Sequence, residues 1–400
     1  MKSVLAALVL ALSFGVAPAG STTYPVPERD PFYAVPSNIT SYADGTVIAS
    51  RAITATAFQL PLPVNAWQLK YRTNDFRGRA SATVTTVLVP RSAWRGAGPR
   101  PLVSYQTAED GVAGRCAPSY ALRAGLRGGF TGSYSETALI ALLLARGWAV
   151  SAPDYEGPHS EFLVAGTEGR GVLDGLRAAR SFAADGISPH APLGLWGYSG
   201  GSLASLAAAQ LQPTYAPELK LTALAVGGLL ASIRAVIDAF SGSIAGSAIP
   251  MGIVGFMRAY PELHLEQYLN ATGRRMVEQE SASCIYETIA RRPFLRMSDI
   301  EAVPNALSQP PIAAMLNANS PLYMSGIPRV PTYAYQTVGD EFAPIKPARA
   351  LLRRFCAGGV AVTRVEAALG EHLTELVLGA PGAVQYMAAR FAGVAPVTNC

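Results

Sequence analysis

A serine lies at the centre of a short glycine-rich pattern in the middle of the chain. Residues 197–201 read Gly-Tyr-Ser-Gly-Gly, a G-x-S-x-G match that is weak by itself in a chain with 38 glycines. Its context is more specific, because the apolar stretch Leu193–Trp196 predicts a strand before it and Ser202–Leu211 predicts a helix after it. So sharp a strand-to-helix turn strains its apex residue and presents that side chain above the carboxyl edge of a parallel sheet. The pattern therefore predicts Ser199 as a nucleophile; the alternative is an idle serine in a glycine-rich turn.

A serine hydroxyl attacks well only when a base takes its proton. When the serine occupies such a turn, the acidic partner and then the histidine follow it along the chain. Two of the four histidines precede the serine, and a third lies in a helical stretch before the sheet resumes: His159, His190 and His264. His372 follows the last expected strand, on a Gly-Glu-His loop at residues 370–372. It is the predicted general base and then general acid.

The acidic partner should follow the strand that precedes the histidine's strand. The stretch Val330–Gln336 predicts that strand, and Asp340 comes shortly after it. We expect Asp340 to hold the imidazole tautomer and offset its charge. Glu341 is the main competitor, whereas Glu371 is adjacent to the histidine and its side chain should diverge on an extended loop.

An acyl-transfer site of this kind also needs donors for a developing oxyanion. The backbone amide of Gly200, directly after the nucleophile, is the first expected donor. The second should come from the loop Gln106–Gly111, which follows the short strand Leu102–Tyr105. The loop has no His-Gly-Gly sequence, so its pattern alone does not identify the donor residue.

Short apolar strands alternate with helices on both sides of the serine. Strands are expected at 66–71, 82–90, 102–105, 149–152, 193–196, 221–226, 330–336 and 360–367, and helices at 137–146, 171–184, 202–211, 347–355 and 382–391. The first two strands alternate in polarity, which predicts half-buried strands at a sheet edge. Residues 20–60 are rich in Pro, Thr and Ser and are expected to wrap the surface. The alternation predicts an α/β class with a largely parallel sheet covered on both faces.

The strand–helix rhythm stops over residues 228–328, where only helices are expected, at 229–240, 252–258, 265–280 and 284–292. The chain is therefore predicted to form one core from residues 20–227 and 329–400, with 228–328 as a helical insert. The insert is apolar at helical spacing. These side chains suit either the insert's own core or a pocket for an acyl chain, since such pockets are mostly apolar.

The first nineteen residues have the features of a secretory signal peptide. Lys2 precedes the apolar stretch Val4–Val16, and Ala-Pro-Ala at 17–19 suits a cleavage site. A buried N-terminal helix is the other interpretation. The later apolar segment 229–257 is interrupted by Arg234, Asp238 and Pro250, so no stable membrane anchor is expected. The prediction is a secreted, extracellular protein.

Four cysteines in a secreted chain suggest disulfides: Cys116, Cys284, Cys356 and Cys400. Four cysteines allow three connectivities, and buried thiols are a further alternative. No CxxC spacing is present, so a metal site is not expected. The formal charge of +5 is dispersed along the chain, which argues against a nucleic-acid partner.

Taken together, the motifs resemble those of the secretory lipase family (the Candida antarctica lipase A type) within the α/β-hydrolase superfamily. The matching segments are residues 104–106, 109–110, 116–120, 197–201, 339–341 and 370–372, which extend over almost the whole chain after the signal peptide. The resemblance implies an α/β-hydrolase core with an inserted helical cap. It also implies lipase or carboxylesterase activity without metal or cofactor.

The family's site residues can be carried over to this sequence one by one. The resemblance implies Ser199, Asp340 and His372 as the catalytic triad, with Asp110 and Gly200 as the oxyanion donors. A carboxylate at Asp110 would repel an oxyanion, but its backbone amide can donate, as can a protonated side chain. The resemblance further implies two disulfides, Cys116 with Cys284 and Cys356 with Cys400.

The expected substrate is a lipid or other carboxylic ester, met at an oil–water interface or in solution, and a monomer is expected. An acyltransferase or a peptidase of the same fold would use the same triad, and a non-catalytic lipid-binding protein is a third alternative. The cap shows no clear carboxylate pair for a peptide amine, and a complete triad argues against a non-catalytic protein. Acyl chain length and alcohol preference do not follow from the sequence.

Overall fold

A computed structural model describes residues 24–400, so the predicted signal peptide at 1–19 lies outside the described residues. A nine-stranded sheet forms the centre, in the order β1-β4-β5-β7-β6-β8-β9-β10-β11. The first four strands in this order pair antiparallel, and the six from β7 to β11 are parallel. Their bounds are β1 Val47–Ile53, β4 Val64–Asn74, β5 Ala80–Pro90, β6 Leu102–Gln106, β7 Ala149–Pro153, β8 Leu193–Tyr198, β9 Leu221–Gly227, β10 Thr332–Thr337 and β11 Val362–Ala367. A separate hairpin pairs β2 (Thr56–Ala57) with β3 (Leu60–Pro61).

Two expectations for the N-terminal strands were wrong. Residues 47–53 form β1, a real edge strand, although residues 20–60 were expected only to wrap the surface. Strand β5 lies inside the sheet, and residues 82–90 are buried along their whole length. Two of its threonines are buried with their hydroxyls paired: Thr83 donates to the Asp154 carbonyl, and Thr85 shares a 2.7 Å hydrogen bond with Ser151.

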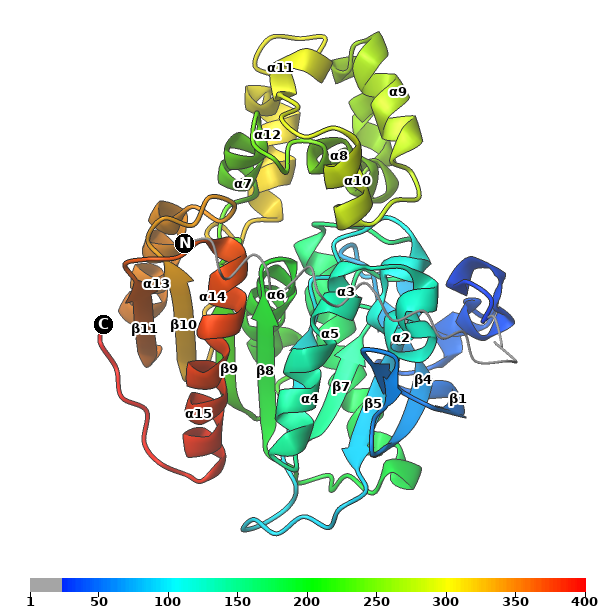
Figure 1. The fold of residues 1–400 in the computed structure, drawn as a ribbon, viewed down its shortest axis with the longest axis vertical. Helices are drawn as coiled ribbons and strands as arrows, with labels where there is room; N and C mark the ends of the chain where they lie inside the picture. The colour runs from blue at the N-terminus through cyan, green and yellow to red at the C-terminus, as the bar shows by residue number, and fades with distance from the viewer. Residues whose placement is uncertain (1–23) are drawn as a thin grey trace.

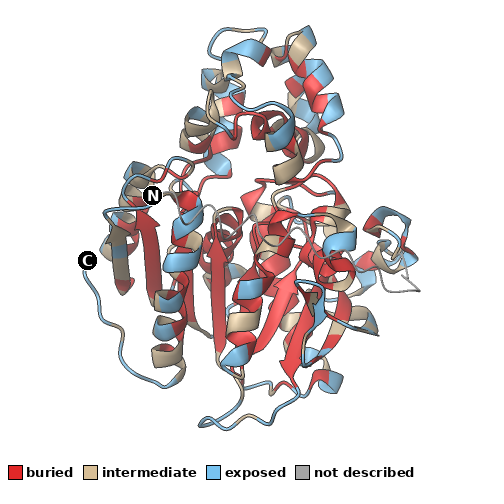
Figure 2. Ribbon diagram, in the orientation of Figure 1, coloured by how far each residue is buried: buried red, intermediate tan, exposed pale blue. Residues whose placement is uncertain are grey.

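Helices cover both faces of the sheet, as the alternation predicted (Figure 1). One face is packed by α5 (Ala165–Ser181), α6 (Gly200–Tyr215) and α13 (Ile345–Ala357), and the other by α2 (Pro118–Ala124), α4 (Thr137–Ala145) and α15 (Ala380–Phe391). Short helices α3 (Gly132–Ser135) and α14 (His372–Leu378) lie near the carboxyl ends of the strands. Figure 2 shows the strands as the buried centre of the molecule.

Helix α5 begins at Ala165, six residues before the expected start. Three glycines in its first two turns lower helix propensity and hid this start. They are needed for packing, since a Cβ on Gly169 would stand 2.8 Å from the backbone of Ala207 in α6. Close contact with α6 therefore outweighs the propensity cost.

Between β9 and β10 the chain forms a group of helices that stands above the carboxyl ends of the strands (Figure 1). They are α7 (Ile233–Phe240), α8 (Ala248–Ala259), α9 (Ala271–Gln279), α10 (Ile285–Arg291), α11 (Met297–Ile300) and α12 (Pro310–Ala318). We call this group the cap. The single helix expected at 265–280 is instead a 3-10 turn at Leu265–Tyr268 followed by α9, because the Asn270 side chain caps α9 by accepting from the Gly273 amide. Helices α11 and α12 were not predicted.

Candidate active site

Ser199 occupies the turn between β8 and α6, with φ 53° and ψ −122°. A positive φ is rare for a side chain other than glycine and is characteristic of such a nucleophile turn. The glycines on either side are required by close contacts. A Cβ on Gly197 would stand 2.1 Å from the Gly201 carbonyl oxygen, and one on Gly201 would stand 1.9 Å from the carbonyl oxygen of Gln106. The turn can therefore fold only with glycine at both positions.

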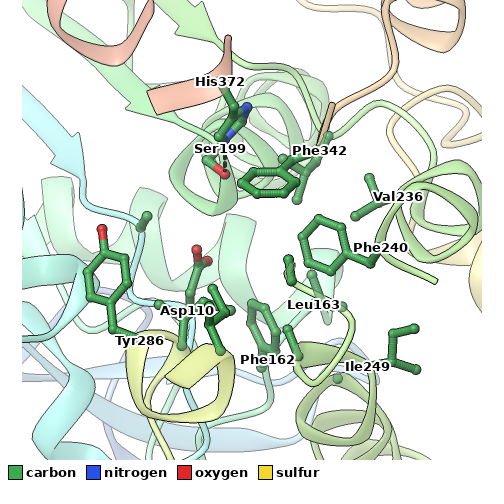
Figure 3. Close-up of a pocket in the computed structure, with 18 of the residues that line it drawn as sticks. Asp110, Phe162, Leu163, Ser199, Val236, Phe240, Ile249, Tyr286, Phe342 and His372 are labelled. Atoms are coloured by element: carbon green, nitrogen blue, oxygen red, sulfur yellow. Dashed lines mark hydrogen bonds between the residues drawn. The ribbon is translucent and has the colours of Figure 1, made fainter. Parts of the chain in front are cut away.

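The imidazole of His372 lies between the serine and a carboxylate (Figure 3). Its Nε2 is 2.8 Å from Ser199 Oγ, and its Nδ1 is 2.9 Å from both carboxylate oxygens of Asp340. The His372 side chain is only 3 % exposed. Three side chains from three separate segments thus form one continuous hydrogen-bonded line.

His372 does not lie on an extended loop, which the sequence had led us to expect. It is the first residue of α14, and the Glu371 carboxylate caps that helix by accepting from the amides of Leu373 and Thr374. The His372 backbone is thus fixed by the start of a helix. Tyr198, next to Ser199, adds a further restraint because its hydroxyl donates to the His372 carbonyl at 2.7 Å.

The two adjacent carboxylates at 340 and 341 have different contacts. Asp340 contacts the imidazole ring, and its Oδ1 also accepts from the amides of Phe342 and Ala343. Glu341 instead accepts from the backbone amide of His372 at 3.1 Å. The structure therefore brings Asp340, and not Glu341, to the ring nitrogen.

Asp110 and Gly200 meet beside the serine. Gly200 is the first residue of α6, where backbone amides have no partner within the helix. A Cβ on Gly200 would stand 1.8 Å from Asp110 Oδ1, so the carboxyl group lies against the glycine. Figure 3 shows this carboxyl group pointing across the cavity toward Ser199 and His372. Burial raises the pKa of Asp110 to about 6, although the nearby His372 lowers it.

The loop that carries Asp110 is fastened to the cap. The carbonyl of Asp110 accepts from the Ile285 amide of α10 at 3.0 Å. A disulfide joins Cys116 to Cys284, and a second one joins Cys356 to Cys400 near the C-terminus. The position of α10 is thereby tied to the loop beside the serine.

Several buried carboxyl groups behind this loop were not anticipated from the sequence. Burial raises the pKa values of Glu109, Glu156 and Glu168 well above their usual range, and repulsion from nearby carboxylates, Asp110 among them, adds to the effect. Burial also raises the pKa of Glu136 to about 8, although its carboxylate accepts from Tyr105 and from the Ala108 amide. No local pattern marks these residues, because their burial arises from distant contacts.

An apolar cavity of about 240 Å³ opens onto the serine and histidine. The cap contributes much of its lining, with Val236, Ile237, Phe240, Ile249, Ile253 and Phe256, and the core adds Phe162, Leu163 and Leu230. Other apolar cap residues are buried in a cluster that cap and core share, among them Ile233, Met251 and Val254. The apolar residues of the insert thus fall into two groups, one that lines the cavity and one that is buried away from it. Over residues 24–400, no cluster of three or more His, Cys, Asp or Glu side chains is placed to hold a metal ion.

Comparison with known proteins now identifies the family. The family model described as "Secretory lipase" matches residues 127–399. The chain belongs to the secretory lipase family. It is therefore a carboxylic ester hydrolase with an α/β-hydrolase fold, as the motifs predicted.

Named relatives and solved structures agree with this membership. "Lipase 4" of Candida albicans is 35 % identical over 94 % of this chain and 83 % of its own length. "Probable inactive lipase MT1628" of Mycobacterium tuberculosis is 34 % identical over 94 % of this chain and 84 % of its own length. The X-ray structure of Candida antarctica lipase A in its closed state is 30 % identical, covers 95 % of this chain and 89 % of that one, and superposes with a TM-score of 0.88.

Among the described residues, no helix is long and apolar enough to cross a membrane.

Proposed function

We propose that this secretory lipase is exported and cleaves carboxylic esters of lipids through an acyl-enzyme on Ser199. The observation that carries the proposal is the line from Ser199 through His372 to Asp340, with contacts of 2.8 and 2.9 Å, at an apolar cavity. Nucleophile, base and base-orienting carboxylate are within hydrogen-bonding reach, as this chemistry requires.

In the proposed reaction, Ser199 Oγ attacks the ester carbonyl while His372 Nε2 accepts its proton. Asp340 holds the Nδ1–H tautomer and stabilises the imidazolium. The amides of Gly200 and Asp110 donate to the tetrahedral oxyanion. His372 then returns the proton to the leaving alcohol. Water, activated by the same histidine, releases the carboxylic acid and restores the serine.

The cavity supports an acyl chain as the group that it receives. Its lining is almost wholly aliphatic and aromatic, and only a few polar groups, Ser199, His372, Asp110 and Glu136 among them, reach it. Apolar pockets of this kind bind apolar groups and use a few polar atoms to fix orientation. Export is supported by the leader pattern at residues 1–19, by the two disulfides and by the family's description as secretory.

A covalent probe tests the proposal. An alkyl fluorophosphonate should label the enzyme once, at Ser199, and p-nitrophenyl esters added beforehand should slow the labelling. Hydrolysis should favour esters over a matched p-nitroanilide, and water should compete with added alcohols as acyl acceptor. Labelling elsewhere would contradict the role of Ser199. Preference for the anilide would favour a peptidase, and transfer to alcohol in place of hydrolysis would favour an acyltransferase.

The pH profile should reveal the Asp110 carboxyl group. With a pKa of about 6, this group is neutral below that pH and becomes a buried carboxylate above it, where it repels the oxyanion. The raised pKa also means that its contribution to folding stability is complete below pH ~4 and is lost as pH rises through about 6. Asp110→Asn should therefore raise kcat/KM above pH 7 by about tenfold relative to wild type. It should also remove the fall in stability between about pH 4 and pH 6.

Glu341→Gln serves as the matched control, since the Glu341 carboxylate accepts from the His372 backbone amide and not from the ring, and it should keep the wild-type pH profile. Rates on a soluble ester and thermal unfolding, both measured from about pH 4 to 9, check the prediction. Superimposable profiles for wild type and Asp110→Asn would contradict it.

A further inference from the structure

Two loops that border the cavity contain residues in strained backbone conformations. Asp110, on the loop after β6, has a φ of 36°. Ser160 and Leu163, on the loop after β7, have φ values of 46° and 69°. A positive φ is unfavourable for a residue with a Cβ, so such a conformation persists only where surrounding contacts hold it. Asp110 and Leu163 both line the cavity, so the contacts that hold these loops also shape the site (Figure 3).

The Arg258 side chain contacts both loops at once. Arg258 lies in the last turn of the cap helix α8, and its guanidinium donates to backbone carbonyls. Its Nη1 donates to the Val112 carbonyl at 2.9 Å and to the His159 carbonyl at 2.7 Å, with a longer contact of 3.2 Å to the Ser160 carbonyl. Its Nη2 donates to the carbonyl of Ser281, within the cap, at 2.7 Å. One cap side chain thus joins the two loops to each other and to the cap.

The stretch that follows Asp110 is fixed at each of its polar backbone groups. The Asp110 carbonyl accepts from the Ile285 amide at 3.0 Å. The Val112 amide donates to the Ser283 carbonyl at 2.9 Å. These bonds leave the Val112 carbonyl for Arg258. The direction of the Asp110 amide depends on this stretch, because without it the backbone could rotate to an unstrained φ.

We propose that Arg258 is a positioning residue for ester hydrolysis, because it holds the Asp110 amide in the direction that an oxyanion donor requires. The inference rests on the proposed function, since it concerns the oxyanion of that reaction. An oxyanion donor is effective only when it is fixed before the charge develops, which a loosely held loop cannot provide. The guanidinium suits this task, since its rigid, planar set of donors can contact several carbonyls at once. A lysine ammonium carries the same charge without that geometry.

Two substitutions of Arg258 and one matched control test the proposal. Arg258→Met keeps a long, unbranched side chain but removes every donor, and Arg258→Lys keeps the charge and part of the donor set. Arg354→Met is the matched control, because the Arg354 guanidinium also donates to four backbone carbonyls, all within residues 321–326. Neither Arg354 nor residues 321–326 line the cavity. A loss that follows only from carbonyls left without donors would therefore occur in both methionine variants.

The first readout compares two inhibitors that differ only in reactivity. Hexyl trifluoromethyl ketone adds reversibly to Ser199 Oγ, whose proton passes to His372, and the adduct oxygen occupies the oxyanion hole. Hexyl methyl ketone fills the same cavity without the adduct, so the ratio of the two inhibition constants cancels any change in binding of the hexyl chain. This ratio should fall at least about tenfold in Arg258→Met, about threefold or more in Arg258→Lys, and less than about twofold in Arg354→Met. The kcat/KM on p-nitrophenyl acetate should fall in parallel, because the adduct resembles the transition state.

The second readout is hydrogen exchange of the amides of residues 110–112, which reports the loop without any need for activity. Exchange should be faster in Arg258→Met than in wild type and in Arg354→Met, because the Val112 carbonyl has lost its tie to the cap.

An unchanged ratio of inhibition constants in the Arg258 variants would overturn the positioning role. An equal change in Arg354→Met would also overturn it, as would a fall in kcat/KM without a change in the ratio. If Arg258→Met does not fold, the same comparison with Arg258→Lys decides. Failure of wild type to hydrolyse the ester or to bind the fluoroketone would instead contradict the proposed function, and hydrogen exchange would still decide whether Arg258 holds the loop.

Discussion

Replacing Ser199 with alanine is expected to lower kcat for ester hydrolysis by roughly 10⁵- to 10⁶-fold, the size of loss found when a serine nucleophile is removed. The reason is that Oγ is the atom that His372 contacts and that would form the acyl bond. The proposed oxyanion donors and the cavity would remain, so a rate somewhat above that of the uncatalysed reaction should persist. Stopped assays on p-nitrophenyl butyrate, together with loss of fluorophosphonate labelling, check the result.

The substitution should leave the fold unchanged. A φ of 53° is equally unfavourable for alanine and for serine, because both carry a Cβ. The methyl group of alanine would occupy the position of the serine Cβ. Ser325→Ala is a matched control, since Ser325 is exposed and lies outside the cavity. Thermal unfolding should be similar for wild type and both variants. Retention of more than about one per cent of kcat in Ser199→Ala would contradict a serine acyl-enzyme.

The contact between Ser199 and His372 could be predicted because its signals are local or depend on order along the chain. The backbone around Ser199 makes contacts so close that no Cβ fits, so glycine is required there. This requirement produces a glycine pattern that can be recognised in the sequence. The order of acid and histidine then left His372 as the only suitable base. The choice between Asp340 and Glu341 was weaker. Which of two adjacent side chains reaches the histidine ring depends on the backbone conformation of the loop, and the sequence does not reveal that conformation.

Features that depend on distant contacts were missed. Helix α14 was hidden because its N-cap is Glu371, a residue not typical of N-caps. Burial of Glu109, Glu156 and Glu168 has no local signature, since each lies on a different segment and they meet only in the folded core. The burial of residues 82–90 in β5 was missed for a related reason. The Thr85 hydroxyl bonds to Ser151 of β7, so a polar residue that predicted contact with solvent is buried instead.

Asp340→Asn is expected to lower kcat by roughly 10³- to 10⁴-fold while leaving the loop folded. The asparagine oxygen can still accept from the amides of Phe342 and Ala343, as Asp340 Oδ1 does. Its amide nitrogen would then face His372 Nδ1 and donate to it. The imidazole would carry its proton on Nε2, the nitrogen that must accept the proton of Ser199. Rates on a soluble ester and the rate of fluorophosphonate labelling should fall together.

A comparison with Glu341→Gln separates control of the tautomer from simple anchoring of the histidine. The introduced glutamine keeps an oxygen that can accept from the His372 backbone amide, so the rate of this variant should change by less than about threefold. If Asp340→Asn acts through the tautomer, its loss should persist at every pH at which the protein is folded, because the missing acceptor cannot be restored by deprotonation. Similar losses in both variants would mean that the two carboxylates only hold α14 in place. A large loss in Asp340→Asn alone is the result expected if contact with the ring nitrogen, rather than proximity to the histidine, determines which carboxylate supports the reaction.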